Sequence, residues 1–117
     1  MPELDSREAA LFIAGIADDR KALDVRILDI RKITLVADYF VIASGPSRIR
    51  VKAIAEAIES QAKQSGLTVR HREGHAGARW ILLDYGPVVV HVFHEEERKF
   101  YDLERLWGDA VEVSLAR

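Results

Sequence analysis

The alternation of apolar and polar residues predicts a chain that begins with a helix followed by two strands. In residues 6–21 an alanine-rich apolar stripe recurs at helical spacing, which predicts an N-terminal helix. Residues 23–27 alternate between apolar and polar side chains, the pattern of a strand with one wet face near the edge of a sheet. Residues 39–43 are apolar on both faces and predict a central strand.

The next segments predict a crossover from a strand through a helix to another strand. Apolar residues between positions 51 and 62 follow helical spacing, and Ser65-Gly66 ends the helix because glycine adopts the left-handed conformation of a cap. Residues 68–72 predict a short polar strand. A helix of this length can set that strand parallel to residues 39–43, with the usual right-handed connection.

Two apolar strands and one more helix complete the predicted elements. Residues 80–83 and 88–93 predict well-buried strands, joined by a tight hairpin because the turn 84–87 contains glycine and proline. A last helix begins at the glutamates 95–97 and ends before Gly108. Its apolar face is carried by Phe100, Leu103 and Trp107. The tail, residues 110–117, either adds a short strand or frays.

Together these elements predict one α/β domain, residues 1–117, with a mixed five-stranded sheet flanked by helices. A chain of 117 residues with 49% hydrophobic residues can bury a core without disulfides, and it contains no cysteine for thiolate chemistry. The net charge of -2 disfavours a general nucleic-acid binder. No apolar run is long enough for a membrane span and the acidic start is unlike a signal peptide, so we expect a cytoplasmic protein.

No common catalytic motif with a readable mechanism is present. The nearest candidate is the turn 44–48, because a strand that leads through Ser44-Gly45 into a helix is similar to the phosphate-gripping turn of nucleotidyltransferases. Those enzymes also need two carboxylates on the following strand to hold magnesium, and here the next acids, Glu56 and Glu59, lie inside the helix. We therefore expect no enzyme activity, no cofactor and no metal.

The remaining charged and ionisable clusters carry weak signals. The cations Arg48, Arg50 and Lys52 lie in the first turns of a helix, where they oppose its dipole. An anion contact, to RNA phosphate or an acidic protein surface, is one interpretation, and a solvated face is the favoured one because such effects are small. Among the histidines, His91 shares a strand face with Val89 and Phe93, so we expect a hydrogen-bonded core residue rather than a metal ligand.

Trp80 is the most informative single residue. Alternation places Trp80, Leu82 and Asp84 on one face of the predicted strand, beside the basic stretch 70–79. A tryptophan at this position fits a core equally well as a protein interface, where tryptophan and arginine are common anchors. Both interpretations stay open at this point.

Four sequence blocks occur in a characteristic order and spacing. They are residues 37–45 (ADYFVIASG), 80–86 (WILLDYG), 88–93 (VVVHVF) and 98–107 (RKFYDLERLW). Together they resemble the successive signatures of the ribosomal silencing factor family, RsfS, also called Iojap. The resemblance runs from about residue 6 to residue 109. One departure is Pro87, where the family often has an acidic residue.

The resemblance implies a nucleotidyltransferase-like α/β fold without the catalytic carboxylates, in a translational repressor. It implies binding to the large ribosomal subunit through the interface ribosomal protein numbered fourteen, which blocks joining of the small subunit when nutrients are scarce. The implied contact residues are Trp80, Leu82, Asp84 and Tyr85, with Glu95, Glu96 and Glu97 as an electrostatic rim. A minor contact with ribosomal RNA is compatible with this picture, and proteins of the family often form homodimers.

Two alternatives belong to other functional classes. The first is an enzyme that processes nucleotides or RNA with the Ser44-Gly45 turn, which would bind a nucleotide with magnesium. The second is a dimeric scaffold, which would associate with itself but not with ribosomal subunits.

Overall fold

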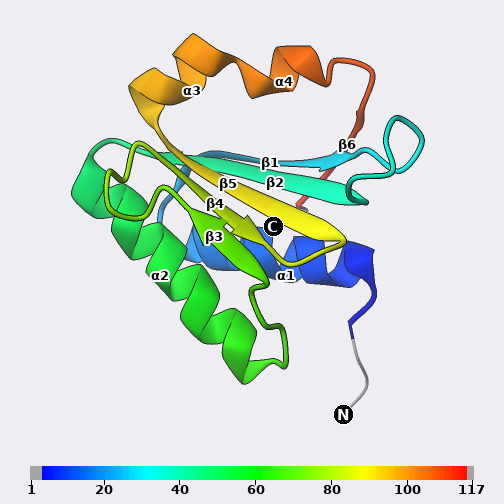
Figure 1. The fold of residues 1–117 in the computed structure, drawn as a ribbon, viewed down its shortest axis with the longest axis horizontal. Coiled ribbons are helices and arrows are strands. Elements are labelled where there is room, and N and C mark those ends of the chain that lie inside the picture. Colours follow the sequence, from blue (N-terminus) through cyan, green and yellow to red (C-terminus); the bar gives the residue numbers. More distant parts are fainter. Residues whose placement is uncertain (1–3, 116–117) are drawn as a thin grey trace.

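The computed structural model describes residues 4–115, which form one six-stranded mixed sheet with helices on both faces (Figure 1). The elements are α1 (Ser6–Asp19), β1 (Leu23–Asp29), β2 (Tyr39–Gly45), α2 (Arg48–Gln64), β3 (His71–Glu73), β4 (Trp80–Asp84), β5 (Val88–His94), α3 (Glu95–Tyr101), α4 (Leu103–Leu106) and β6 (Val111–Val113). The strand order is β3-β4-β5-β2-β1-β6. The central neighbours β2 and β5 are parallel, and the other neighbouring strands are antiparallel.

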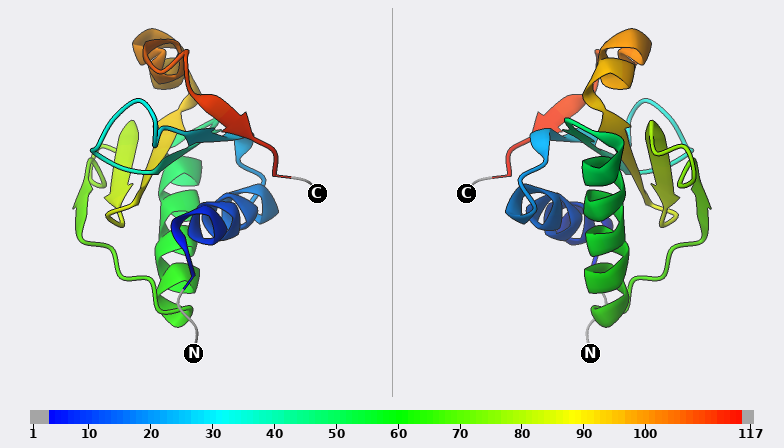
Figure 2. Two further views of the ribbon diagram at one scale, coloured as in Figure 1. Left: turned by 90° about the vertical axis from the view of Figure 1, so that its right-hand side faces the viewer. Right: turned by 90° about the vertical axis from the view of Figure 1, so that its left-hand side faces the viewer.

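The larger core lies between the sheet and the helices α1 and α2, which cover the same face (Figure 2). Ile13 of α1, Ile54 of α2, Val41 of β2 and Val90 of β5 are all inaccessible to solvent. Both central strands are apolar on both sides, and this is why the sequence predicted 39–43 as a central strand. The structure confirms that prediction, because every residue of β2 is buried.

The helix ends follow local side-chain chemistry. Asp5 caps α1 by accepting a hydrogen bond from the Glu8 backbone over 2.7 Å, and the Glu8 carboxylate accepts one from the Asp5 backbone in return. Ser47 caps α2, and Gly66 follows its end with a φ of 86°. None of the helices in residues 4–115 has the length and apolar content that a membrane crossing requires.

A smaller core lies on the opposite face of the sheet, under α3 and α4 (Figure 2). Phe40 of β2 and Phe93 of β5 pack there against Leu103 of α4. The ring of Trp107 meets Phe40 edge-on at a centroid distance of 5.2 Å. These two helices are short, so this face of the sheet is less completely covered than the other.

The strands differ from the sequence prediction in three respects. The sheet has six strands rather than five, because the tail adds β6, which pairs with β1 and brings Val113 into the larger core. β3 occupies residues 71–73 rather than 68–72, at the edge beside β4. It does run parallel to β2, as predicted, but β4 and β5 lie between them. β4 was predicted to be well buried, and alternate side chains are half-exposed instead.

The predicted last helix is broken in two. Asp102 adopts a left-handed conformation, with a φ of 46°, and its backbone N–H donates to the carbonyl of Arg98. The break turns the following helix onto the sheet, so that Leu103 is buried while Phe100 is 78% exposed. The prediction that one unbroken helix carries these two residues on a single apolar face was therefore wrong.

Candidate functional site

The face of the sheet that α1 and α2 do not cover presents part of β4 to solvent. Along this strand Trp80, Leu82 and Asp84 are half-buried, whereas Ile81 and Leu83 are fully buried in the larger core. Successive side chains point to opposite sides of a strand, so the first three share the open face. The predicted alternation along this strand is thus confirmed.

The open face continues onto β3. His71 lies opposite Asp84 in the antiparallel register, and Glu73 lies opposite Leu82. Residues opposite each other in a sheet point to the same side, so these side chains extend the open face to the edge. The His71 imidazole and the Glu73 carboxylate are 3.5 Å apart. We call these five side chains, those of Trp80, Leu82, Asp84, His71 and Glu73, the Trp80 face.

Contacts with the smaller core hold Trp80 in place. Its indole N–H donates a hydrogen bond to Nδ1 of His91 over 3.1 Å, and its ring stacks on Phe93 at a centroid distance of 4.7 Å. The ring of Tyr101, from α3, lies 5.0 Å away. Trp80 is therefore anchored on the smaller core on one side while part of it remains accessible, and the interface interpretation stays a prediction for the accessible part.

His91 is a buried hydrogen-bonding residue of β5. Only 4% of it is exposed, and burial lowers the pKa of its imidazole to about 4. The neutral ring can accept the indole N–H at Nδ1, which confirms the expected core histidine. Its Nε2 is buried and has no hydrogen-bond partner among the residues that the structure describes, and the rings of His91 and Phe40 are in edge contact at 4.8 Å.

The structure does not bring Tyr85 to the Trp80 face. Tyr85 is 7% exposed and belongs to the larger core, on the opposite side of the sheet from Trp80, Leu82 and Asp84. Burial raises the pKa of its phenol to about 12. Alternation along the strand accounts for this position, since Tyr85 follows the parity of Leu83.

Aromatic side chains of α3 lie beside the Trp80 face, and Leu106 of α4 is exposed as well. Phe100 is 78% exposed, Tyr101 47% and Leu106 76%. The rings of Phe100 and Tyr101 are in edge contact at 5.0 Å, and Tyr101 also contacts Trp80. Large apolar side chains gathered at a surface are typical of interaction sites.

The Ser44-Gly45 turn is filled by a side chain of the protein itself. Ser44 is 3% exposed, and its hydroxyl donates to the carbonyl of Leu23 over 3.2 Å. The guanidinium of Arg98, from α3, donates to the same hydroxyl over 3.1 Å. Arg98 also pairs with Glu104 at 3.1 Å and with Asp24 at 3.6 Å. Within residues 4–115 no three His, Asp or Glu side chains gather as a metal site would need.

The three glutamates form the first turn of α3, where the helix dipole favours negative charge. They are Glu95, Glu96 and Glu97. The Glu97 carboxylate is 3.8 Å from the guanidinium of Arg79, the residue before Trp80. The acidic turn therefore lies at the start of β4, next to one end of the Trp80 face.

The predicted cations lie in the first turns of α2, and two of them, Arg48 and Lys52, line one small hollow. They are Arg48, Arg50 and Lys52. Arg50 donates to the carbonyl of Arg20 over 2.5 Å, a structural bond between α2 and the end of α1. Arg48 is exposed and shares a small hollow with Glu96 and Glu97. One cation is thus bound to backbone and another faces acids, which fits the solvated-face interpretation better than an anion site.

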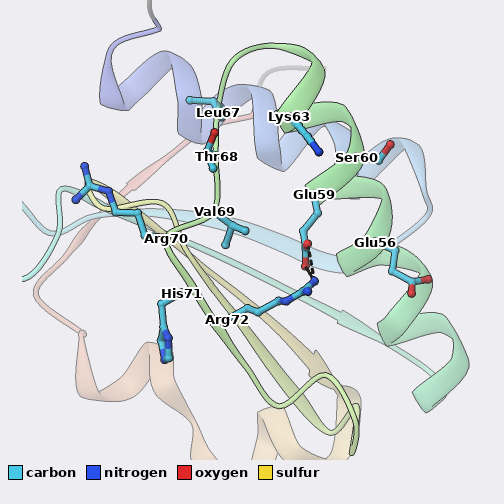
Figure 3. Close-up of a pocket in the computed structure, with 10 residues that line it drawn as sticks. All are labelled: Glu56, Glu59, Ser60, Lys63, Leu67, Thr68, Val69, Arg70, His71 and Arg72. Carbon is cyan, nitrogen blue, oxygen red and sulfur yellow. Dashed lines mark hydrogen bonds and ion pairs between the residues drawn. The ribbon is translucent and has the colours of Figure 1, made fainter.

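A groove of about 530 Å³ separates α2 from the segment that leads into β3 (Figure 3). Its lining comprises Glu56, Glu59, Ser60, Lys63, Leu67, Thr68, Val69, Arg70, His71 and Arg72. Figure 3 shows Arg72 reaching across to Glu59, a pair whose closest atoms are 2.8 Å apart, while His71 points away from the helix. Arg72 lies opposite Leu83 in the register, so it points away from the Trp80 face.

Comparisons with known proteins agree with the four sequence blocks. The family model described as "Ribosomal silencing factor during starvation" matches residues 3–117. The chain belongs to the ribosomal silencing factor family. A ribosomal silencing factor of Bacillus subtilis is 51% identical over 90% of this chain and 90% of its own length. One of Halalkalibacterium halodurans is 43% identical over 96% of both chains.

Solved structures agree as well. A crystal structure of a protein from Chromobacterium violaceum superposes with a TM-score of 0.88 at 33% identity, covering 97% of this chain and 94% of that one. The mixed sheet flanked by helices is thus the fold of this member of the ribosomal silencing factor family, as the sequence predicted.

Several residues around the Trp80 face and the Ser44 turn of this silencing factor could not be found from the sequence. His71 and Glu73 join the Trp80 face through the β3 register, which the misplaced strand 68–72 concealed. Arg98 reaches Ser44 across 54 positions of the chain. The only sequence signal for Arg98 was its place at the start of the fourth block shared with the ribosomal silencing factor family.

We expect stability to fall as the pH decreases from 6.5 towards 4. His91 has a pKa of 6.5 when unfolded and about 4 when folded, so in this range the unfolded chain binds more protons. The contribution of neutral His91 to the free energy of unfolding is complete above pH 6.5 and is lost as the pH falls through the folded pKa. This contribution is at most about 3 kcal/mol. Hydrogen bonding to Arg31 lowers the pKa of Asp29, so the stability that this carboxylate contributes is lost mainly below the lower end of this pH range.

Thermal melts of the parent and of His91→Phe across this pH range test the expectation. The variant should show a flatter dependence of the melting temperature on pH, because phenylalanine does not titrate. Identical pH dependences would show that His91 is not the responsible group.

Proposed function

We propose that this protein represses translation by binding the large ribosomal subunit through the interface ribosomal protein numbered fourteen, and so blocks joining of the small subunit when nutrients are scarce. Membership of the ribosomal silencing factor family supports a ribosomal target. The observation that carries the choice of surface is the partly accessible indole of Trp80, fixed on an open sheet face by Phe93 and His91.

The chemistry around the Trp80 face suits a protein partner with basic groups. An anchored tryptophan beside exposed aromatic side chains is the composition found at the energetic centre of protein interfaces. Acidic side chains lie at its margins, with Glu73 at the sheet edge and Glu95–Glu97 near the start of β4. Charges at a rim steer encounter with a partner of opposite sign.

Steric exclusion is a sufficient mechanism for this function. The described residues extend over 35 × 33 × 28 Å. A body of this size bound where two subunits meet occupies volume that the second subunit needs. Joining then falls in proportion to the fraction of large subunits that carry the protein, without any chemical step.

A non-catalytic role in the cytoplasm is part of the proposal. The hydroxyl of Ser44 is hydrogen-bonded to Leu23 and Arg98, which supports a structural role for it rather than one in gripping a phosphate. The alternative, a nucleotide- or RNA-processing enzyme, would show magnesium-dependent nucleotide transfer that is lost in Ser44→Ala. Such an activity in the purified protein would favour the enzyme over the repressor.

Replacing Trp80 with alanine should weaken binding to large subunits by about 2 kcal/mol, close to thirtyfold. Binding weakens because the substitution removes the anchored aromatic ring from the Trp80 face. Sedimentation of the variant with purified large subunits, well below its melting temperature, measures the effect. Small subunits serve as the negative control for the partner.

Trp107→Ala is the matched control for this variant. Trp107 is the other tryptophan of the chain, also half-buried, and it packs on Phe40 beneath the helices rather than on the Trp80 face. It should lose stability but keep its affinity for large subunits. If both variants lose affinity in step with their melting temperatures, the Trp80 face is not the binding site.

A further inference from the structure

His91 buries one imidazole nitrogen that makes a hydrogen bond and one that makes none within the described residues. The ring is buried on the face of the sheet that carries Trp80 and Phe93, and within residues 4–115 its Nε2 has no hydrogen-bond partner. Because Nδ1 accepts from the indole, the proton of the neutral ring resides on Nε2. A buried donor without a partner is destabilising, and a phenylalanine of similar volume would avoid that cost.

The favourable contact that distinguishes histidine from phenylalanine here is the bond to Trp80. In the register of β4 with β5, Trp80 lies opposite Phe93, and His91 lies opposite Leu82. All four side chains are therefore on one side of the sheet. Phe93 supplies a flat surface on which the indole could lie in more than one orientation, whereas the 3.1 Å bond to Nδ1 fixes where its N–H points.

We propose that His91 is a positioning residue: it holds the indole of Trp80 in the orientation that the ribosomal partner meets. This inference rests on the proposed function, because it concerns the same face. A side chain that is already ordered loses little conformational entropy on binding. His91 thus raises affinity without contacting the partner, from which it is separated by Trp80 and the helices above it.

Two substitutions separate positioning from packing. His91→Phe keeps a planar ring but removes the acceptor, whereas His91→Asn provides a carbonyl oxygen near the place of Nδ1 at the expense of volume. The indole ¹H–¹⁵N resonance of Trp80, assigned by its absence from Trp80→Phe, reports the hydrogen bond. Affinity for large subunits and the melting temperature are measured on the same samples.

We expect His91→Phe to fold with an equal or higher melting temperature, to show a shifted indole resonance with faster hydrogen exchange, and to bind large subunits about three- to tenfold more weakly. His91→Asn should restore part of the affinity and of the indole signal despite a lower melting temperature. Stability and affinity would then move in opposite directions, which a purely structural role does not produce.

Three outcomes would overturn the inference. An unchanged indole resonance in His91→Phe would show that the bond does not set the orientation of Trp80. A shifted resonance with parental affinity would show that the orientation does not matter to the partner. Affinity that follows the melting temperature through both variants would assign His91 to packing. If Trp80→Ala itself binds like the parent, the proposed function of the face fails first, and the indole resonance still decides whether His91 positions Trp80.

Discussion

Val90→Asp should leave the chain largely unfolded. Val90 lies in the middle of β5, between β4 and β2, with no exposed surface. An aspartate there places a carboxylate in the larger core without a hydrogen-bond donor, at a cost of at least about 4 kcal/mol. A small domain has only about 5 to 15 kcal/mol of stability, so most of it would be lost. Circular dichroism during thermal unfolding measures the change.

Leu35→Asp is the control for that experiment. Leu35 lies in the loop between β1 and β2 and is fully exposed, with a relative accessibility of 103%. The same charge placed there should leave the melting temperature within a few degrees of the parent. A Val90→Asp variant that melts like Leu35→Asp would contradict the central place of β5 in the sheet.

Arg98→Ala should cost about 3 kcal/mol of folding stability, the range found when one partner of a buried ion pair is removed. Arg98 is 7% exposed and is hydrogen-bonded to Ser44, Leu23 and Glu104. It is therefore the polar connection between the broken C-terminal helix and strands β1 and β2. We expect the loss to appear as a lower unfolding free energy in urea, together with earlier proteolytic cleavage near Asp102.

Two further variants decide whether the network carries this effect. Lys99→Ala changes the exposed neighbour on the same helix and should be nearly neutral. Arg98→Ala combined with Glu104→Ala should cost less than the sum of the two single changes, because either single change already removes the ion pair between them. Strict additivity would mean that the ion pair contributes little.

Local periodicity was enough to predict that the central strands are covered on both faces of the sheet. Residues 39–43 are apolar at every position, and residues 88–93 are apolar at every position except His91; only a strand covered on both faces accommodates that pattern. In β4 the alternation equally predicted which side chains share one face of the sheet. Trp80 and Ile81 are both large and apolar, so their sequence does not say which one is fully buried. Ile81 is, because α3 and α4 cover the face that carries Trp80 only in part.

Features set by distant contacts could not be predicted in this way. The apolar spacing of Phe100, Leu103 and Trp107 continues through Asp102 as though the helix were unbroken, so the pattern conceals the left-handed residue. The network that fills the Ser44 turn joins side chains from β1, β2, α3 and α4. Tyr85 was grouped with the contact residues because it belongs to the same sequence block, although strand parity turns it inward.

The two edges of the sheet limit how a partner can bind. β3 and β6 each contain three residues, β3 is composed of ionisable side chains, and β6 has Glu112 at its centre. Short, charged edges oppose the addition of a strand from another chain, which would otherwise extend the backbone ladder without regard to sequence. Recognition by this sheet therefore depends on side chains rather than on main-chain pairing, so its selectivity can change through single substitutions on one face while the fold stays the same.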